Sequence, residues 1–168
     1  QLVISSSSAV AKGVRTHKNQ LHICYCHSPM RYAWDLQEQY LSDAGLNKGL
    51  KGIYARYILK KIRKWDTLNS NNVNFFIANS NHIAKRIKKI YNLESTVIYP
   101  PVDVDFFSLE EEKEEYYFTA SRLVPYKNTQ IIVEAFNELS HLKLIVAGDG
   151  PELKKLKKIA KSNIKFVG

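Results

Sequence analysis

The sequence has 168 residues, of which 45% are hydrophobic, and its formal net charge is +9. This content is sufficient for an ordinary folded core, whereas no apolar run is long enough to span a bilayer and no secretory signal is recognisable. Two cysteines are too few for a disulfide framework, so composition argues against a disulfide-rich secreted domain and favours a reducing compartment.

The positive charge is concentrated in residues 48–91, which contain eleven basic residues and one acid, Asp66. An acidic run from Glu110 to Glu115 has the composition of a solvated connector. The composition also shifts at Pro100-Pro101. We therefore expect a first domain over residues 1–101, a linker over 102–115 and a second domain over 116–168.

In the first domain, short apolar or β-branched runs alternate with segments of helical periodicity. The predicted strands are 2–5, Leu21–Cys26, Phe75–Ala78 and 97–99, and the predicted helices are 31–41, 53–65 and one that starts at Asn79-Ser80. His22, Cys24 and Cys26 share one face of their strand, but no second ligand cluster accompanies them. We therefore predict buried cysteines and no metal site there.

His27 follows the second predicted strand directly. A histidine at the carboxyl end of a strand in an α/β sheet is well placed for a ligand cleft. By itself, however, such a residue is more often a packing or hydrogen-bonding residue than a catalytic one.

The segment 51–65 combines apolar positions at helical spacing with many cations. One interpretation is a basic amphipathic helix that rests on anionic lipid headgroups, with each nearby cation contributing about 1 kcal/mol. The other, slightly favoured by the sequence alone, is a core-packed helix with a solvated cationic face. The two interpretations are compatible.

The second domain begins with a predicted strand at 116–120, a loop at 121–127 and a helix from Asn128. A continuous apolar run at 142–147, a Gly148-Asp149-Gly150-Pro151 turn, a lysine-rich helix and a strand-like run at 164–167 follow. Strand, helix and strand at this spacing form a βαβ unit, which predicts an α/β fold with parallel sheets flanked by helices.

Arg122 and Lys127 lie in the loop that leaves the first strand of this unit, just before a helix start. Ligands bind at that edge of parallel sheets, and a helix N-terminus attracts anions. Arginine matches phosphate oxygens with a fork of donors, and lysine adds a compact charge. On spacing alone, a phosphate site and two solvated loop charges are about equally supported.

The segments SRLVPYKN, LIVAGDGPELKKL and NIKFVG closely resemble the C-terminal domain of retaining glycosyltransferases of family 4, which have the GT-B fold. Upstream, YCHSPMRYAWDL resembles bacterial mannosyltransferases of that family that build O-antigen and related polysaccharides. FFIANSNHIAKRIKK and STVIYPPVDVDFF resemble the part of the family where the chain crosses between two Rossmann-like domains. The resemblance implies parts of both domains, with the acceptor-side domain first.

This resemblance assigns roles by position. Arg122 and Lys127 match the R-x4-K motif that holds the donor diphosphate, and His27 matches the histidine beside the donor sugar. The residues implied on the acceptor side are Arg31, Tyr32 and Trp34. Asp103 and Asp105 form a D-x-D pattern, but they follow a Pro-Pro linker, so we expect linker and capping roles, no metal and no cofactor.

The implied activity is transfer of a hexose, mannose from GDP-mannose, to a lipid-linked or polysaccharide acceptor in cell-surface glycan synthesis, with retained anomeric configuration. The expected partners are the nucleotide-sugar, the acceptor and an anionic membrane surface contacted by the basic helix 51–65, at the inner face of the bacterial plasma membrane. The family's E-x7-E segment is absent from these residues, so we expect an interior fragment that is inactive alone.

Two alternatives remain at this stage. A noncatalytic, membrane-associated partner protein would explain the missing glutamates, and a nucleic-acid-binding module would explain the charge and the ten tyrosines. Against nucleic acid, the cations lie on helix backs and the aromatic residues fall mostly within apolar runs.

Overall fold

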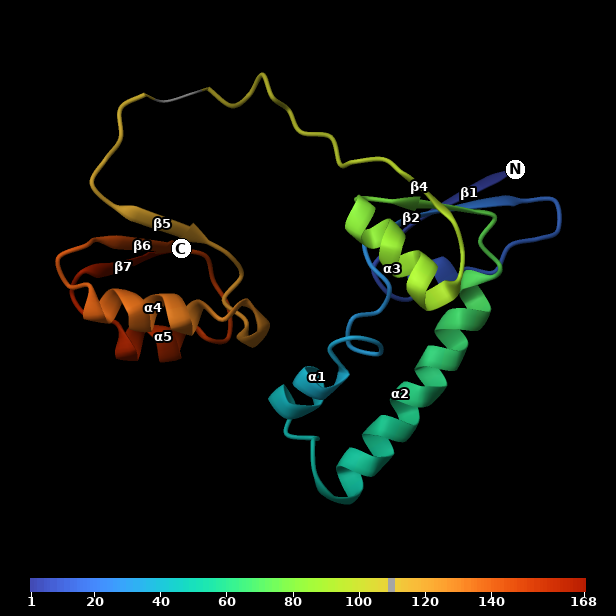
Figure 1. The fold of residues 1–168 in the computed structure, drawn as a ribbon, viewed down its shortest axis with the longest axis horizontal. Coiled ribbons are helices and arrows are strands. Elements are labelled where there is room, and N and C mark those ends of the chain that lie inside the picture. Colours follow the sequence, from blue (N-terminus) through green and yellow to red (C-terminus); the bar gives the residue numbers. More distant parts are fainter. Residues whose placement is uncertain (109–110) are drawn as a thin grey trace. The chain divides into compact units, whose positions relative to one another are not determined.

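The computed structural model describes residues 1–108 and 111–168, which form two compact units, Gln1–Asp103 and Val104–Gly168 (Figure 1). The boundary falls within the expected linker 102–115, and residues 109–110, which include the first glutamate of the acidic run, lie outside the described residues. Each unit places helices against a parallel β-sheet, which confirms the predicted α/β class.

The first unit contains a four-stranded parallel sheet in the order β1-β2-β3-β4. Its strands are β1 (Leu2–Ser7), β2 (Leu21–Cys26), β3 (Phe75–Ala78) and β4 (Ser95–Val97). Its helices are η1 (Ala11–Gly13), α1 (Gln37–Asp43), α2 (Gly49–Ser70) and α3 (Asn81–Tyr91). Because the strands are parallel and in sequence order, their carboxyl ends meet at one edge.

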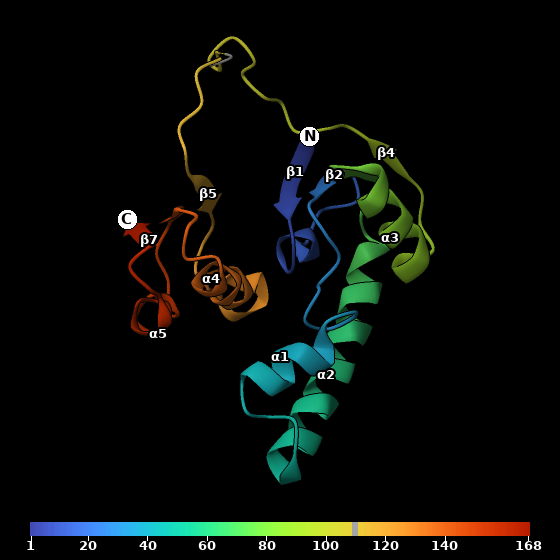
Figure 2. The same cartoon turned by 60° about the vertical axis from the view of Figure 1, so that its left-hand side comes forward.

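The core of this unit lies between the sheet and α3 (Figure 2). α3 buries residues at a spacing of four, Ile83, Ile87 and Tyr91, against the buried face of β2 and β3. Its start is capped by Ser80, whose Oγ accepts a hydrogen bond from the Ile83 amide at 3.3 Å. Capping by Ser80 therefore explains why the sequence predicts a helix start at Asn79-Ser80.

The predicted helix at 31–41 is only partly correct, because residues 31–36 form turns and α1 begins at Gln37. The amides of Ala33 and Trp34 both donate to the Met30 carbonyl, and Met30 and Ala33 are completely buried. The Trp34 indole also donates to Asp66 at 2.9 Å. These tertiary contacts outweigh the local helical periodicity.

α2 is longer than the predicted helix 53–65, and its first half runs beside α1 beyond the end of the sheet (Figures 1 and 2). Among the described residues, none of the helices combines the length and the apolar character that crossing a membrane requires.

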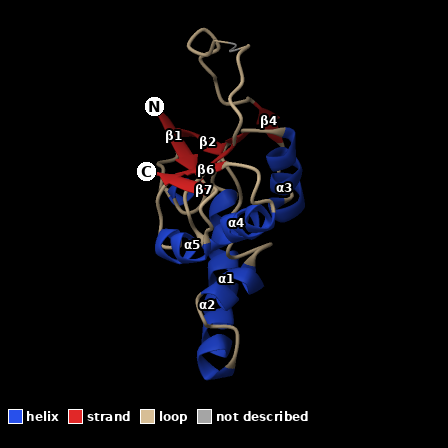
Figure 3. Cartoon of the chain, turned by 90° about the vertical axis from the view of Figure 1, so that its left-hand side faces the viewer, coloured by secondary structure: helices blue, strands red, loops and turns tan. Residues whose placement is uncertain are grey.

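The second unit contains a three-stranded parallel sheet in the order β5-β6-β7, with helices packed on it (Figure 3). The strands are β5 (Tyr117–Ala120), β6 (Leu144–Ala147) and β7 (Ile164–Val167), and the helices are η2 (Pro125–Lys127), α4 (Thr129–Glu138) and α5 (Leu153–Ile159). Val133 of α4 and Leu156 of α5 are buried against Leu144 and Val146, so both helices cover the same face of the sheet.

Candidate functional site

Arg122 and Lys127 occupy the connection from the carboxyl end of β5 to the start of α4, in the second unit. Between them, Leu123 is fully buried in the core and anchors the loop. η2 then turns the chain, and Asn128 adopts a left-handed conformation with φ of 52° before the helix begins. The loop is therefore fixed at its centre, while both cations project from its exposed parts.

The turn after β6 holds this loop in place by backbone hydrogen bonds. The Ser121 amide donates to the Ala147 carbonyl at 3.1 Å, and the Leu123 amide donates to the Asp149 carbonyl at 2.9 Å. A Cβ atom at Gly148, where φ is 127°, would collide with the carbonyl oxygen of Ser121. The glycine lets two adjacent strand-end loops approach each other closely, which defines the position of Arg122.

The electrostatic character of this edge is positive. Among the described residues, the side chain of Arg122 makes no ion pair or hydrogen bond. Within the same residues, the ammonium group of Lys127 contacts only the ring of the adjacent Tyr126, with Nζ 5.8 Å from the ring centroid. No side-chain oxygen caps the first turn of α4. Two solvent-facing cations and an uncapped helix N-terminus together form an arrangement suited to an anion such as a diphosphate.

His27 lies in the first unit, directly after β2, at the carboxyl edge of that sheet. A 2.8 Å hydrogen bond joins His27 Nε2 and the Oγ of Ser6 near the end of β1, and the His27 amide donates to the Ser7 carbonyl at 2.9 Å. The Tyr25 ring meets the imidazole edge-on, with ring centroids 5.3 Å apart. The imidazole is exposed and oriented, as a ligand-contacting histidine needs to be.

The three residues expected on the acceptor side have different environments. Trp34 donates its indole N–H to Asp66, and the Tyr32 hydroxyl donates to the Met30 sulfur at 3.3 Å. Burial, followed by the nearby Asp66 carboxylate, raises the pKa of Tyr32. Arg31 is exposed, and its charge is the second cause, after burial, of a lowered pKa of Arg86. The structure therefore gives Trp34 a clear structural role and leaves Arg31 facing solvent.

The cysteines and His22 lie on the buried face of β2. Both thiols are free, and the hydrogen bond between them, followed by burial, raises the pKa of Cys26. Ser5 Oγ and His22 Nε2 form a 2.9 Å hydrogen bond. Within the described ranges, no group of three or more His, Cys, Asp or Glu side chains is placed to hold a metal ion, Asp103 and Asp105 included.

Sequence reasoning missed a buried ionic network beneath the same sheet. Lys12 of η1 is 1% exposed and Asp66 of α2 is fully buried, with Nζ and Oδ1 2.5 Å apart. The Tyr91 hydroxyl donates to Asp66 Oδ2 at 2.7 Å, beside the Trp34 indole. This network connects η1, α2, α3 and the segment after His27. The one signal in the sequence is that Asp66 is a lone acid in a basic region.

Comparisons with known proteins find one family model that matches part of the chain, and solved structures with a similar fold. Residues 102–164 match the family model described as "Glycosyl transferases group 1". The chain also matches 23 chains of solved structures, among them a point mutant of S. aureus TarM crystallised with Fondaparinux, alpha-GlcNAc-glycerol and UDP. That match has a TM-score of 0.57 at 18% sequence identity, and covers 91% of this chain but 29% of the TarM chain. No curated protein sequence matches.

The family match contains Arg122, Lys127 and the glycine turn, whereas His27 lies outside it. The structural match extends over both units and shows the fold. Residues 102–164 thus match the group 1 glycosyl transferases, and the described chain has the α/β fold of part of a GT-B glycosyltransferase.

Proposed function

We propose that this chain is part of a retaining glycosyltransferase that transfers a hexose from a nucleotide-sugar to a lipid-linked or polysaccharide acceptor. The donor that we favour is GDP-mannose, on the resemblance of residues 25–36 to bacterial mannosyltransferases. The observation that carries the proposal is the exposed pair Arg122 and Lys127 beside the uncapped start of α4, inside the region that matches the group 1 family.

In this proposal, Arg122 and Lys127 bind the donor diphosphate and stabilise the charge that builds on it as the glycosidic bond breaks. This accelerates transfer to the extent that the two cations bind the transition state more tightly than the ground state. A helix dipole and two side-chain cations supply the stabilisation that a divalent ion supplies in other transferases, so we propose neither a metal nor a cofactor.

His27 is the third proposed catalytic residue, and its role is to orient the donor sugar near the reacting carbon. Its hydrogen bond to Ser6 fixes the imidazole, which supports a positioning role. We retain Arg31 and Tyr32 as proposed acceptor-side residues. For Trp34 we propose only an indirect role on the acceptor side, because its indole N–H already donates a hydrogen bond to Asp66.

We further propose that the enzyme works at the inner face of the bacterial plasma membrane. Support comes from α2, where Lys60, Lys61 and Lys64 are free of ion pairs within the described part of the chain. Anionic headgroups attract such cations with about 1 kcal/mol each near the surface.

The proposal is tested by titrating the protein with GDP, UDP and GDP-mannose in a calorimeter. A hydrogen bond to a charged group contributes about 1.5–3 kcal/mol, so Arg122→Ala or Lys127→Ala should weaken diphosphate binding by at least about tenfold. Lys154→Ala, which removes an exposed lysine of α5, is the matched control and should bind as the unmodified protein does.

If the Arg122 and Lys154 variants bound every nucleotide with equal affinity, the proposed diphosphate site would be refuted. Binding of UDP in preference to GDP would replace GDP-mannose as the donor but preserve the site. If nucleic acid bound with a steep salt dependence while nucleotide-sugars did not bind, the transferase proposal would be replaced by the nucleic-acid alternative.

A further inference from the structure

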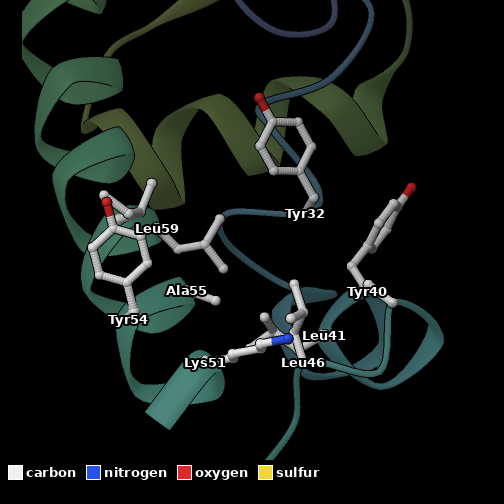
Figure 4. A pocket seen from close by; sticks show the side chains of 10 residues that line it. Tyr32, Tyr40, Leu41, Leu46, Lys51, Tyr54, Ala55 and Leu59 are labelled. Carbon is white, nitrogen blue, oxygen red and sulfur yellow. The ribbon is translucent and has the colours of Figure 1, made fainter.

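An apolar groove lies in the first unit between α1, the first half of α2 and the turn before α1 (Figure 4). Its volume is about 550 Å³, within the range of about 300–1,000 Å³ that is typical of ligand pockets. We call it the α1–α2 groove, and the residues that define it include Tyr32, Tyr40, Leu41, Leu46, Tyr54 and Leu59. Apart from tyrosine hydroxyls and one lysine, these side chains offer no polar atoms.

The surface around the groove is also apolar. Leu50, Ile53 and Tyr54 at the start of α2 are 85%, 67% and 65% exposed. Tyr54 both lines the groove and faces solvent, so the apolar lining extends onto the outer face of α2. Clustered exposed apolar side chains next to a groove are typical of a binding surface, unlike single scattered ones.

Charged side chains of both signs lie near the groove, because α1 contributes Glu38 and Asp43, but the charged residue that lines it is Lys51. Lys51 lines the groove, and its side chain reaches across toward Leu41 and Leu46 (Figure 4). Within residues 1–108 and 111–168, its ammonium group has no ion pair or hydrogen bond. The acid that pairs with α2 from α1 is Glu38, and it is bound to Arg56 at 2.6 Å. Among the described residues, the Lys51 ammonium therefore lacks an anionic partner.

We propose that the α1–α2 groove binds the hydrocarbon chain of a lipid-linked acceptor and that Lys51 pairs with the phosphate of that lipid. This inference rests on the proposed transferase function, because it names the part of the acceptor that the first unit holds. Each buried CH₂ group contributes about 0.8 kcal/mol, so a chain of a few isoprene units would provide most of the affinity, and the phosphate would fix its direction.

Two other occupants fit less well. A peptide segment would bury backbone N–H and C=O groups, and the apolar lining offers them almost no hydrogen-bond partners, whereas a hydrocarbon chain needs none. A second copy in a two-fold dimer would bring the lysine-rich α2 of one copy against the same α2 of the other. Like charges at close range would oppose that association.

The test uses farnesyl phosphate as the probe, with farnesol and inorganic phosphate as its two halves. Ala55→Trp fills the groove from α2, and Leu68→Trp adds the same ring to an exposed position in the second half of α2 that does not line the groove. We expect Ala55→Trp to weaken farnesyl phosphate binding at least tenfold and Leu68→Trp to leave it unchanged. Lys51→Gln should weaken binding of farnesyl phosphate but not of farnesol.

Should Ala55→Trp fail to fold, Tyr54→Glu tests the same point, because its carboxylate at the exposed mouth of the groove would repel the phosphate. Binding by Ala55→Trp or Tyr54→Glu as strong as in the unmodified protein would overturn the proposal. So would a dimer that Ala55→Trp converts to a monomer, because the groove would then belong to a second copy.

The same titrations separate this inference from the proposed function. Arg122→Ala should leave farnesyl phosphate binding intact, since Arg122 lies in the other unit. If farnesyl phosphate binds through the groove but no nucleotide binds through Arg122, the lipid site stands and the transferase proposal fails. If nucleotides bind as proposed but farnesyl phosphate does not, the lipid site alone is overturned.

Discussion

Removal of the buried carboxylate by Asp66→Asn is predicted to destabilise the first unit severely. Asp66 is the only acid in contact with the buried ammonium of Lys12 among the described residues, and it also accepts hydrogen bonds from Tyr91 and Trp34. Breaking a buried ion pair from one side costs about 3–5 kcal/mol, because an uncompensated charge remains. With a urea m-value of about 2 kcal/mol/M, the unfolding midpoint should fall by about 2 M.

Both tryptophans, Trp34 and Trp65, lie in the first unit, so urea unfolding followed by tryptophan fluorescence reports on that unit alone. Glu94→Gln is the control, because the Lys88–Glu94 pair is 53% and 84% exposed and should contribute at most about 1 kcal/mol. High salt should weaken the exposed pair but not the buried one. A loss of less than about 1 kcal/mol for Asp66→Asn would refute the assigned network.

The double variant Lys12→Met, Asp66→Leu refines the same argument. Removing both charges eliminates the unpaired ammonium, and apolar replacement of a buried pair is often neutral or stabilising. Here the hydroxyl of Tyr91 and the indole of Trp34 would lose their common acceptor, at about 1–3 kcal/mol each. The double variant should therefore recover only part of the stability lost in Asp66→Asn.

Two further predictions concern the two sheets. Burial lowers the pKa of His22 below 6.5, so below about pH 6.5 the unfolded chain binds a proton that the folded chain excludes. The free energy of unfolding should therefore fall as the pH drops below about 6.5. In fluorescence-monitored unfolding, His22→Gln should abolish this pH dependence, whereas His82→Gln, at an exposed site, should not. Gly148→Ala should lower the free energy of unfolding by at least about 2 kcal/mol, because the new Cβ would collide with Ser121 and because φ is positive at this position. The loss should appear as faster amide exchange in β5–β7, while Gly168→Ala should have no effect.

Most strands of this fold were predictable, although the strand predicted at 97–99 lies at Ser95–Val97. β2, β3 and β7 begin and end where the apolar runs predicted, because short β-branched and aromatic runs between turn residues leave little choice of element. The helix predicted over residues 31–41 was wrong in its first half. There, the buried contacts of Met30 and the Trp34–Asp66 hydrogen bond depend on α2, whose position a local pattern does not contain.

The candidate site was predictable to different degrees in the two units. The placement of Arg122 and Lys127 followed from strand, loop and helix order alone, since the carboxyl edge of a parallel sheet fixes where such a loop lies. The partner of His27 was not predictable, because Ser6 lies 21 residues away and meets it only through the pairing of β1 with β2. The α1–α2 groove likewise depends on the packing of two helices.

The burial of Asp66 also changes how the charge of α2 should be understood. In the sequence it is the lone acid among eleven bases, and a sequence count treats it as partial neutralisation of a basic surface. In the structure Asp66 is buried and forms an ion pair with Lys12 of η1, so its charge offsets none of the lysines that α2 presents to solvent. The solvent-facing side of α2 is therefore more cationic than the net charge of its own segment indicates. A hydrocarbon chain that carries a phosphate would satisfy both the apolar groove and this uncompensated charge.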